Sequence, residues 1–208
     1  MRWPPRGRPA PDGMAHPARM ADPGDRPEPA DRPTRPEHLP GGFLERRVVL
    51  LTGPLDAGLA ARVGAQLLAL AARAPEPIRL YLASPDGELD AAVTVMDALD
   101  TIGMPVDAVI TGHLGGPSLG VLAAADRRRA YRHATFRLSE PRVWRWGTGD
   151  QLAAEAARTI ALLESLYERL ARATGRPMEE LRRDARAGRV LTATEAIDYG
   201  LVEAIVEG

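Results

Sequence analysis

The sequence contains no cysteine and no lysine, and it has few aromatic residues and only four histidines. The absence of cysteine excludes disulfides, a thiol nucleophile and cysteine metal ligands. The histidines are scattered without the spacing of a metal site, so we expect neither a metal nor another cofactor. All 27 basic residues are arginine, and the net charge of −1 points to neither nucleic acid nor an anionic membrane as a partner.

Long apolar runs are also missing. No stretch approaches the length of a membrane-spanning helix, so we expect no membrane association. The arginines near the N-terminus are not followed by an apolar segment, as they would be in a secretory signal. We therefore expect a cytoplasmic protein. At 208 residues, the chain is long enough for one domain with a sizeable core.

Proline is abundant in one region. Residues 1–42 contain eleven of the 19 prolines, among arginine, acidic residues and glycine. Such a segment buries too little apolar surface to offset the entropy lost on ordering. The composition therefore predicts a disordered N-terminal arm over 1–42 and a folded domain over 43–208.

Within 43–208, short apolar runs alternate with helical periodicities. We expect strands at 47–51, 78–83, 105–111 and 201–206, and one strand or a bent pair within 131–138. We expect helices at 55–74, 88–102, 119–125, 151–172 and 178–187, and a last short helix opened by the capping box at 192–195. This strand–helix alternation predicts an α/β domain with a parallel sheet.

Two short segments need a separate interpretation. The arginines at 127–129 follow the helix expected at 119–125, where cations suit the helix dipole, so we interpret them as a solvated helix end. The segment 143–146 alternates apolar residues with arginine, which favours an extended conformation.

Two glycine-bearing turns follow neighbouring strands, one at Asp86-Gly87 and one at Gly115-Gly116. In a parallel sheet, the functional edge lies at the carboxyl ends of the strands. Glycine allows a ligand to approach the backbone closely. The pair of turns could form an oxyanion hole. They could equally be no more than tight connections between strand and helix.

Four runs, in this order, resemble the proteolytic subunit of the Clp protease: RVVLLTG at 47–53, then LYLASPDG, GGPSLG and TEAIDYGLVEAIV. The likeness extends from about Phe43 to the end of the chain. It implies the crotonase-like ββα superhelix fold of that serine peptidase family. It also implies a homo- or hetero-oligomeric ring of Clp-type subunits, served by an ATP-dependent unfoldase.

The resemblance also assigns two catalytic positions. The family has an aspartate in the helix that follows a Thr-Gly dipeptide, and TGRPMEELRRD puts Asp184 there. The family's Ser-Pro-Gly-Gly turn appears as 84–87, so the N–H of Gly87 is the expected first oxyanion donor. Asp86 replaces a glycine of that turn, and its carboxylate would repel an oxyanion unless it points away.

The nucleophile depends on the alignment. With two extra residues after Gly112, Ser118 is the nucleophile and the N–H of Leu119 is the second oxyanion donor. Without a gap, the nucleophile position falls on Gly116 and the second donor on Pro117, which has no N–H. Both alignments are open at this point.

The general base of the family has no counterpart. A histidine is expected near the end of the strand within 131–138, and that position falls on Ser139, or on Pro141 if the alignment shifts. Neither residue is a general base at neutral pH. His133 lies several residues from the expected place, whereas His113 belongs to the turn that contains Ser118 and could reach it.

The sequence therefore predicts a Clp-type proteolytic subunit that is catalytically impaired and acts as a structural or regulatory ring subunit. One alternative is an active serine endopeptidase that uses Ser118 with an unconventional base. A second alternative is a crotonase-like enzyme acting on acyl thioesters, which needs paired backbone N–H groups but no nucleophile.

Overall fold

The computed structural model describes residues 42–141 and 146–207. These residues fall within one compact unit, Leu39–Gly208. The predicted N-terminal arm lies outside the described residues except for Gly42, and so does the segment 143–146 except for Trp146.

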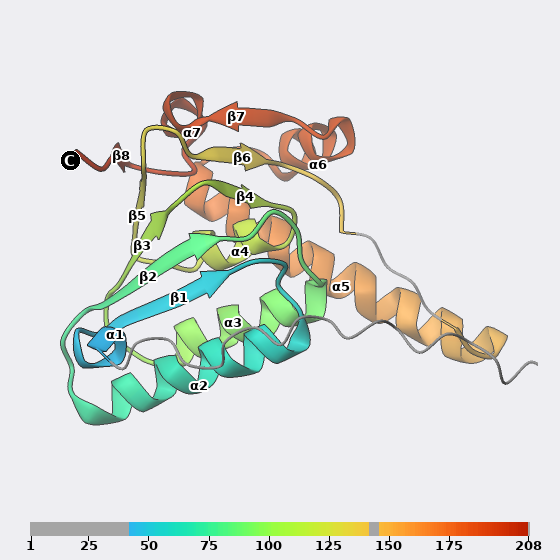
Figure 1. Cartoon of the computed structure of the whole chain (residues 1–208). Coiled ribbons are helices and arrows are strands. Elements are labelled where there is room, and N and C mark those ends of the chain that lie inside the picture. Colours follow the sequence, from blue (N-terminus) through green and yellow to red (C-terminus); the bar gives the residue numbers. More distant parts are fainter. Residues whose placement is uncertain (1–41, 142–145, 208) are drawn as a thin grey trace, which may run out of the picture. The chain divides into compact units, whose positions relative to one another are not determined.

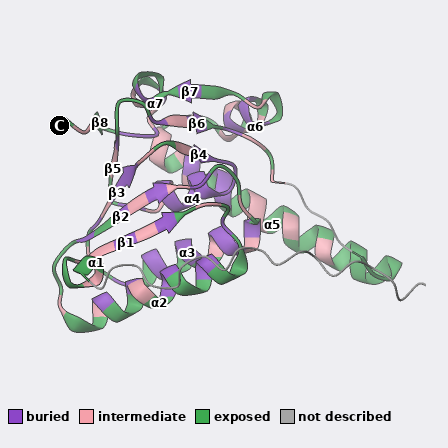
Figure 2. Cartoon of the chain, in the orientation of Figure 1, coloured by how far each residue is buried: buried purple, intermediate pink, exposed green. Residues whose placement is uncertain are grey.

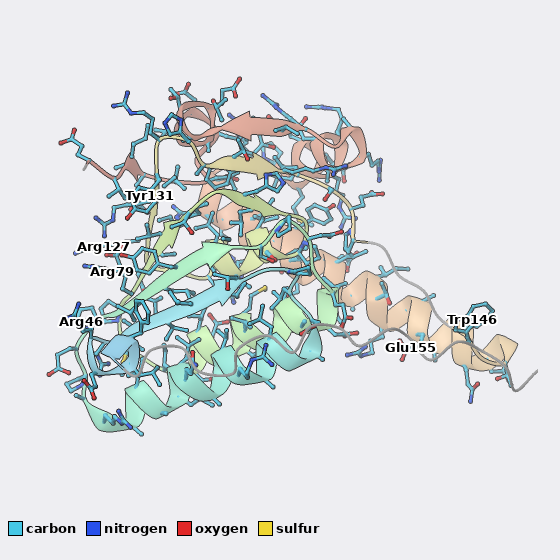
Figure 3. All side chains as sticks on the ribbon, viewed as in Figure 1. Arg46, Arg79, Arg127, Tyr131, Trp146 and Glu155 are labelled. Carbon is cyan, nitrogen blue, oxygen red and sulfur yellow. The ribbon has the colours of Figure 1, made fainter. Side chains whose placement is uncertain are left out.

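A five-stranded parallel sheet forms the centre of this unit, with the strand order β1-β2-β3-β5-β8 (Figure 1). The strands are β1 (Val48–Thr52), β2 (Ile78–Ala83), β3 (Val106–Ile110), β5 (Arg127–Ala130) and β8 (Ala204–Ile205). Alternate residues such as Val49, Leu80 and Ala108 are fully buried, whereas Arg79 and Arg127 point to the other face (Figure 3). The predicted α/β domain with a parallel sheet is confirmed.

Three helices pack together with the buried face of this sheet: α2 (Ala57–Arg73), α3 (Leu89–Thr101) and α4 (Ser118–Ala123). Helix α2 begins where the Asp56 carboxylate accepts a hydrogen bond from the N–H of Leu59, so a side chain satisfies one of the unpaired amides of the first turn. Its apolar residues Val63 and Leu67 face α3 and the sheet, and burial of each such side chain contributes about 1.5–3 kcal/mol.

A second, three-stranded sheet lies beside the first, made of β4 (His113–Gly115), β6 (Thr135–Arg137) and β7 (Val190–Thr192). β4 runs parallel to β6, and β6 runs antiparallel to β7. The sequence had indicated a turn at β4 and had not indicated β7. The predicted capping box forms between Thr192 and Glu195 and opens α7 (Ala193–Tyr199).

The arginine triplet is not a helix end, and that interpretation was wrong. Residues 127–129 belong to β5, which pairs with β3. Arg129 forms an ion pair with Asp107 of β3, and Arg128 donates to Glu203 and to the carbonyl of Ala173. Partners from distant segments thus satisfy two of the three guanidinium groups, which local helix-dipole reasoning could not indicate.

Helix α5 (Gly149–Thr174) is buried only near its C-terminal end, at Leu166, Tyr167 and Leu170. Its first half is largely exposed (Figure 2), and Ile160 there is 57% exposed. Two short helices complete the unit, α1 (Gly42–Glu45) and α6 (Met178–Ala187). Among the described helices, none is both long and apolar enough to cross a membrane.

Candidate functional site

The two glycine-bearing turns lie against each other. The N–H of Gly115 donates to the carbonyl of Ser84 at 2.8 Å. A Cβ on Gly115 would lie 2.5 Å from the carbonyl oxygen of Pro85, which is closer than such atoms can approach. Glycine at 115 is therefore required for the turn after β2 to contact β4.

Ser118 is the first residue of α4, and its side chain is fully buried. Its hydroxyl donates to the Ser84 hydroxyl at 2.9 Å, which in turn donates to the carbonyl of Asp86 at 3.0 Å. The Ser118 hydroxyl thus stabilises the turn at 84–87 through the Ser84 hydroxyl. A hydroxyl in this position is shielded from a peptide bond that arrives from solvent.

Both expected oxyanion donors already have partners within the chain. The N–H of Gly87 donates to Oδ1 of Asp86 at 2.9 Å. The N–H of Leu119 donates to the carbonyl of Gly116 at 3.1 Å. The Asp86 carboxylate thus turns toward the Gly87 amide and occupies the place that an oxyanion would take.

Gly116 has the positive φ of +55° that favours glycine. A Cβ built on it would lie 3.5 Å from Oγ of Ser139 and 3.0 Å from Oδ1 of Asp86. A side chain at 116 would therefore face residue 139, which is the relation that the alignment without a gap requires. Pro117, the next residue, has no N–H to offer.

Next to these residues lies a cavity of about 500 Å³. It is bounded by the turn after β2, by β4, by the end of β6 and by the end of α6. Its polar lining residues are Asp86, His113, Arg137, Ser139, Glu140 and Arg186. Neither Ser118 nor Asp184 lines it, so the cavity does not bring the two predicted catalytic residues together.

Asp184 is buried on α6 and is tied to the protein interior. Its carboxylate accepts hydrogen bonds from the Tyr199 hydroxyl at 2.8 Å and from Nη1 of Arg189 at 2.9 Å. Burial raises the pKa of Asp184, but these two hydrogen bonds and the nearby guanidinium charges outweigh it and hold the pKa below its ordinary value. The guanidinium of Arg176 stacks on the Tyr199 ring, 4.1 Å from its centroid.

The two histidines that the structure describes, His113 and His133, have no hydrogen bond to Ser118. Nδ1 of His113 is 2.7 Å from the Thr135 hydroxyl, across the β4–β6 pair. His133 is exposed and lines a separate cavity of about 970 Å³, together with Tyr131, Ile205 and Val206. Within the described residues, no group of three or more histidine, aspartate or glutamate side chains could hold a metal ion.

Arg137 is a cavity residue that the sequence did not indicate. It is the last residue of β6, and its Nη2 lies 3.9 Å from where a Cβ on Gly188 would be. Its only signal in the sequence was its position within the strand expected at 131–138. That signal does not say which face of the strand borders a cavity.

Comparisons with known proteins agree on one family. The model of the family described as "Clp protease" matches residues 35–208. The chain is 34% identical over 162 residues to ATP-dependent Clp protease proteolytic subunit 3 of Rhizobium etli, which covers 77% of this chain and 84% of that protein. It is 32% identical over 166 residues to ATP-dependent Clp protease proteolytic subunit 1 of Nocardia farcinica, covering 78% of this chain and 84% of that protein.

Proposed function

The chain belongs to the family of Clp protease proteolytic subunits, and from this we propose that it is a subunit of a Clp-type peptidase assembly that is itself impaired in peptide hydrolysis. In that assembly it has a structural or regulatory role.

The occupied oxyanion donors carry this proposal. Hydrolysis of a peptide bond builds negative charge on the carbonyl oxygen, and free N–H groups must be aimed at that charge. Here the Gly87 N–H is bonded to the Asp86 carboxylate and the Leu119 N–H to the Gly116 carbonyl. Loss of a single oxyanion donor costs about 10²- to 10³-fold in rate. The Asp86 carboxylate would also repel the developing charge.

The nucleophile and base positions support the same proposal. A side chain at position 116 would face Ser139. In an active subunit, the nucleophile would instead face the imidazole of the base. Ser118 is buried and bonded to Ser84, and the Nδ1 of His113 is engaged with Thr135. A serine without a base remains almost wholly protonated at neutral pH, and loss of triad members costs several orders of magnitude in rate.

The assembly is the second part of the proposal. Subunits of this family typically form oligomeric rings, and the first half of α5 exposes apolar side chains such as Leu152 and Ile160. Exposed apolar residues gathered on one helix favour a protein interface. We propose a ring with copies of this chain or with a triad-complete Clp subunit in the cytoplasm, and an ATP-dependent unfoldase as its partner.

The test is hydrolysis of a short fluorogenic peptide by the purified full chain, together with labelling by a fluorophosphonate. We expect neither activity, whereas a triad-complete Clp proteolytic subunit assayed in parallel should show both. Labelling that disappears in Ser118→Ala would overturn the proposal and favour an active serine endopeptidase. Loss of that labelling in His113→Ala would then identify the base. Turnover of an acyl thioester would instead favour the crotonase-like enzyme.

A further inference from the structure

One face of the parallel sheet is open to solvent. Among the described helices, α2, α3 and α4 pack on the opposite face, which carries Leu80 and Ala108. Arg79 of β2 and Arg127 of β5 lie on the open face, and both are exposed (Figure 3). Parallel sheets in proteins are almost always covered on both faces. The open face is therefore a candidate surface for a further polypeptide segment.

This open face carries more positive than negative charge. Arg79, Asp107 and Arg127 lie in register across three neighbouring strands. Asp107 is already bound to Arg129, whose Nε donates to its Oδ1 at 3.3 Å. Arg79 and Arg127 have no ion pair with a described acid. Their two guanidinium groups therefore remain for an acidic ligand.

The acids that border this face have other partners. Asp126 precedes Arg127 in the chain, and its Oδ2 accepts a hydrogen bond from the N–H of Val106 at 2.7 Å. Glu203 pairs with Arg128 at 3.3 Å. These two acids thus form no ion pair with the two arginines of the open face.

An apolar and aromatic row lies beside the charged one. Tyr81 and Val109 are in register with each other and with Arg129. Val109 is only 3% exposed although it is not part of the main core, so its neighbours on the open face cover it. Tyr81 is half-buried. Aromatic rings at a protein surface are a common contact for proline-rich segments.

The spacing of Arg79 and Arg127 restricts which acidic segment fits. The two residues are two strands apart in register, so their backbones are separated by about 10 Å. In a polyproline II segment, three residues make one turn and span about 9 Å. Carboxylates three positions apart on such a segment lie on one side of it, at the spacing of the two arginines.

The sequence contains this pattern in residues 22–31, DPGDRPEPAD. The acids of the segment stand at every third position, at Asp22, Asp25, Glu28 and Asp31. Its single arginine, Arg26, falls on a different side of a three-residue turn, and its prolines favour polyproline II. These residues lie outside the described part of the chain, and the pattern is a property of their sequence.

We propose that residues 22–31 of a second copy of the chain dock on the open face of the sheet. Arg79 and Arg127 pair with acids three positions apart, and prolines pack beside Tyr81. The proposal rests on the assembly proposed above, which brings copies of the chain together, but it does not depend on whether the chain hydrolyses peptides. Because the contact depends on exposed charges, it weakens as the salt concentration rises.

Fluorescence anisotropy of a labelled peptide with the sequence of residues 22–31 tests the contact. The protein is the full chain with the four acids of its own segment changed to amides, so that they do not compete. We expect saturable binding that weakens with salt. Arg79→Gln and Arg127→Gln should each weaken it about 2- to 5-fold, the effect of an exposed ion pair. The matched control is Arg62→Gln, an exposed arginine of α2, which should leave the affinity unchanged.

A second peptide makes the test independent of whether the variants fold. It has the same composition, but no two of its acids stand three or six positions apart. We expect it to bind several-fold less tightly, because its acids do not present the spacing of the two arginines from one side. Equal binding of the two peptides, or full affinity after both arginines are changed, would overturn the proposal.

Sedimentation equilibrium of the full chain tests whether the segment belongs to a second copy. The variant with four amides should self-associate more weakly than the wild type, and equal association would overturn docking between copies. The proposed function fails separately. Intact association without peptide binding would refute the docking alone, whereas cleavage of the fluorogenic peptide would refute the impaired subunit alone. A wild-type chain that stays monomeric would refute both the assembly and the docking.

Discussion

The two sides of helix α6 differ in how their polar groups are satisfied. On the inner side, the Asp184 carboxylate is held by Tyr199 and Arg189 in a closed network. On the other side, the end of α6 borders a cavity in which Arg137 has no acidic partner among the described residues. The difference shows that the scaffold fully engages a buried carboxylate on one side of α6, whereas the other side leaves an arginine without an acidic partner among the described residues.

The largest expected effect is on the Asp184 side. Asp184→Ala leaves the Tyr199 hydroxyl and the Arg189 guanidinium without their acceptor, and we expect a loss of about 2–3 kcal/mol in the free energy of unfolding. Urea denaturation measures it. The matched control is Asp198→Ala, an exposed acid next to Tyr199, which should change stability by less than about 0.5 kcal/mol. Equal effects of the two variants would mean that Asp184 is not part of the scaffold.

The pH dependence of the free energy of unfolding tests the same role of Asp184. Because the pKa of Asp184 is lower in the folded than in the unfolded state, its ionisation stabilises the fold above about pH 4. That contribution is lost as the pH falls through the folded pKa. Asp184→Asn lacks this dependence, so the stability gap between the wild type and Asp184→Asn should narrow below about pH 4. A gap that is independent of pH would contradict the assignment.

The smallest expected effect is on the cavity side. The double variant Gly116→Ser, Ser139→His places a serine and a histidine at two positions that face each other. We nevertheless expect no peptide hydrolysis, because the Gly87 N–H remains bonded to Asp86 and Pro117 still offers no N–H. Adding Asp86→Gly to the double variant tests which defect matters more, the Gly87 N–H bonded to Asp86 or the missing N–H of Pro117. Peptide hydrolysis by the double variant alone would show that the bond between the Gly87 N–H and Asp86 does not limit the reaction.

The elements of the fold were largely predictable because their signals are local. Buried residues alternate in β2, and the spacing of Val63 and Leu67 predicts α2. The capping box at Thr192 located α7 within one residue. The short strands β4 and β7 were missed, since three residues show no periodicity and pair only with segments far away in the chain.

The sequence by itself determined the family and the parallel α/β domain, because residue types and local patterns suffice for these, and it predicted that no histidine stands where the family has its base. Only the tertiary structure decided that Gly116 faces Ser139, that Asp86 occupies the Gly87 amide, and that Asp184 faces Tyr199. These relations depend on the direction of side chains from segments that meet only after folding. A shift of one residue in the register of a strand moves each of its side chains to the opposite face.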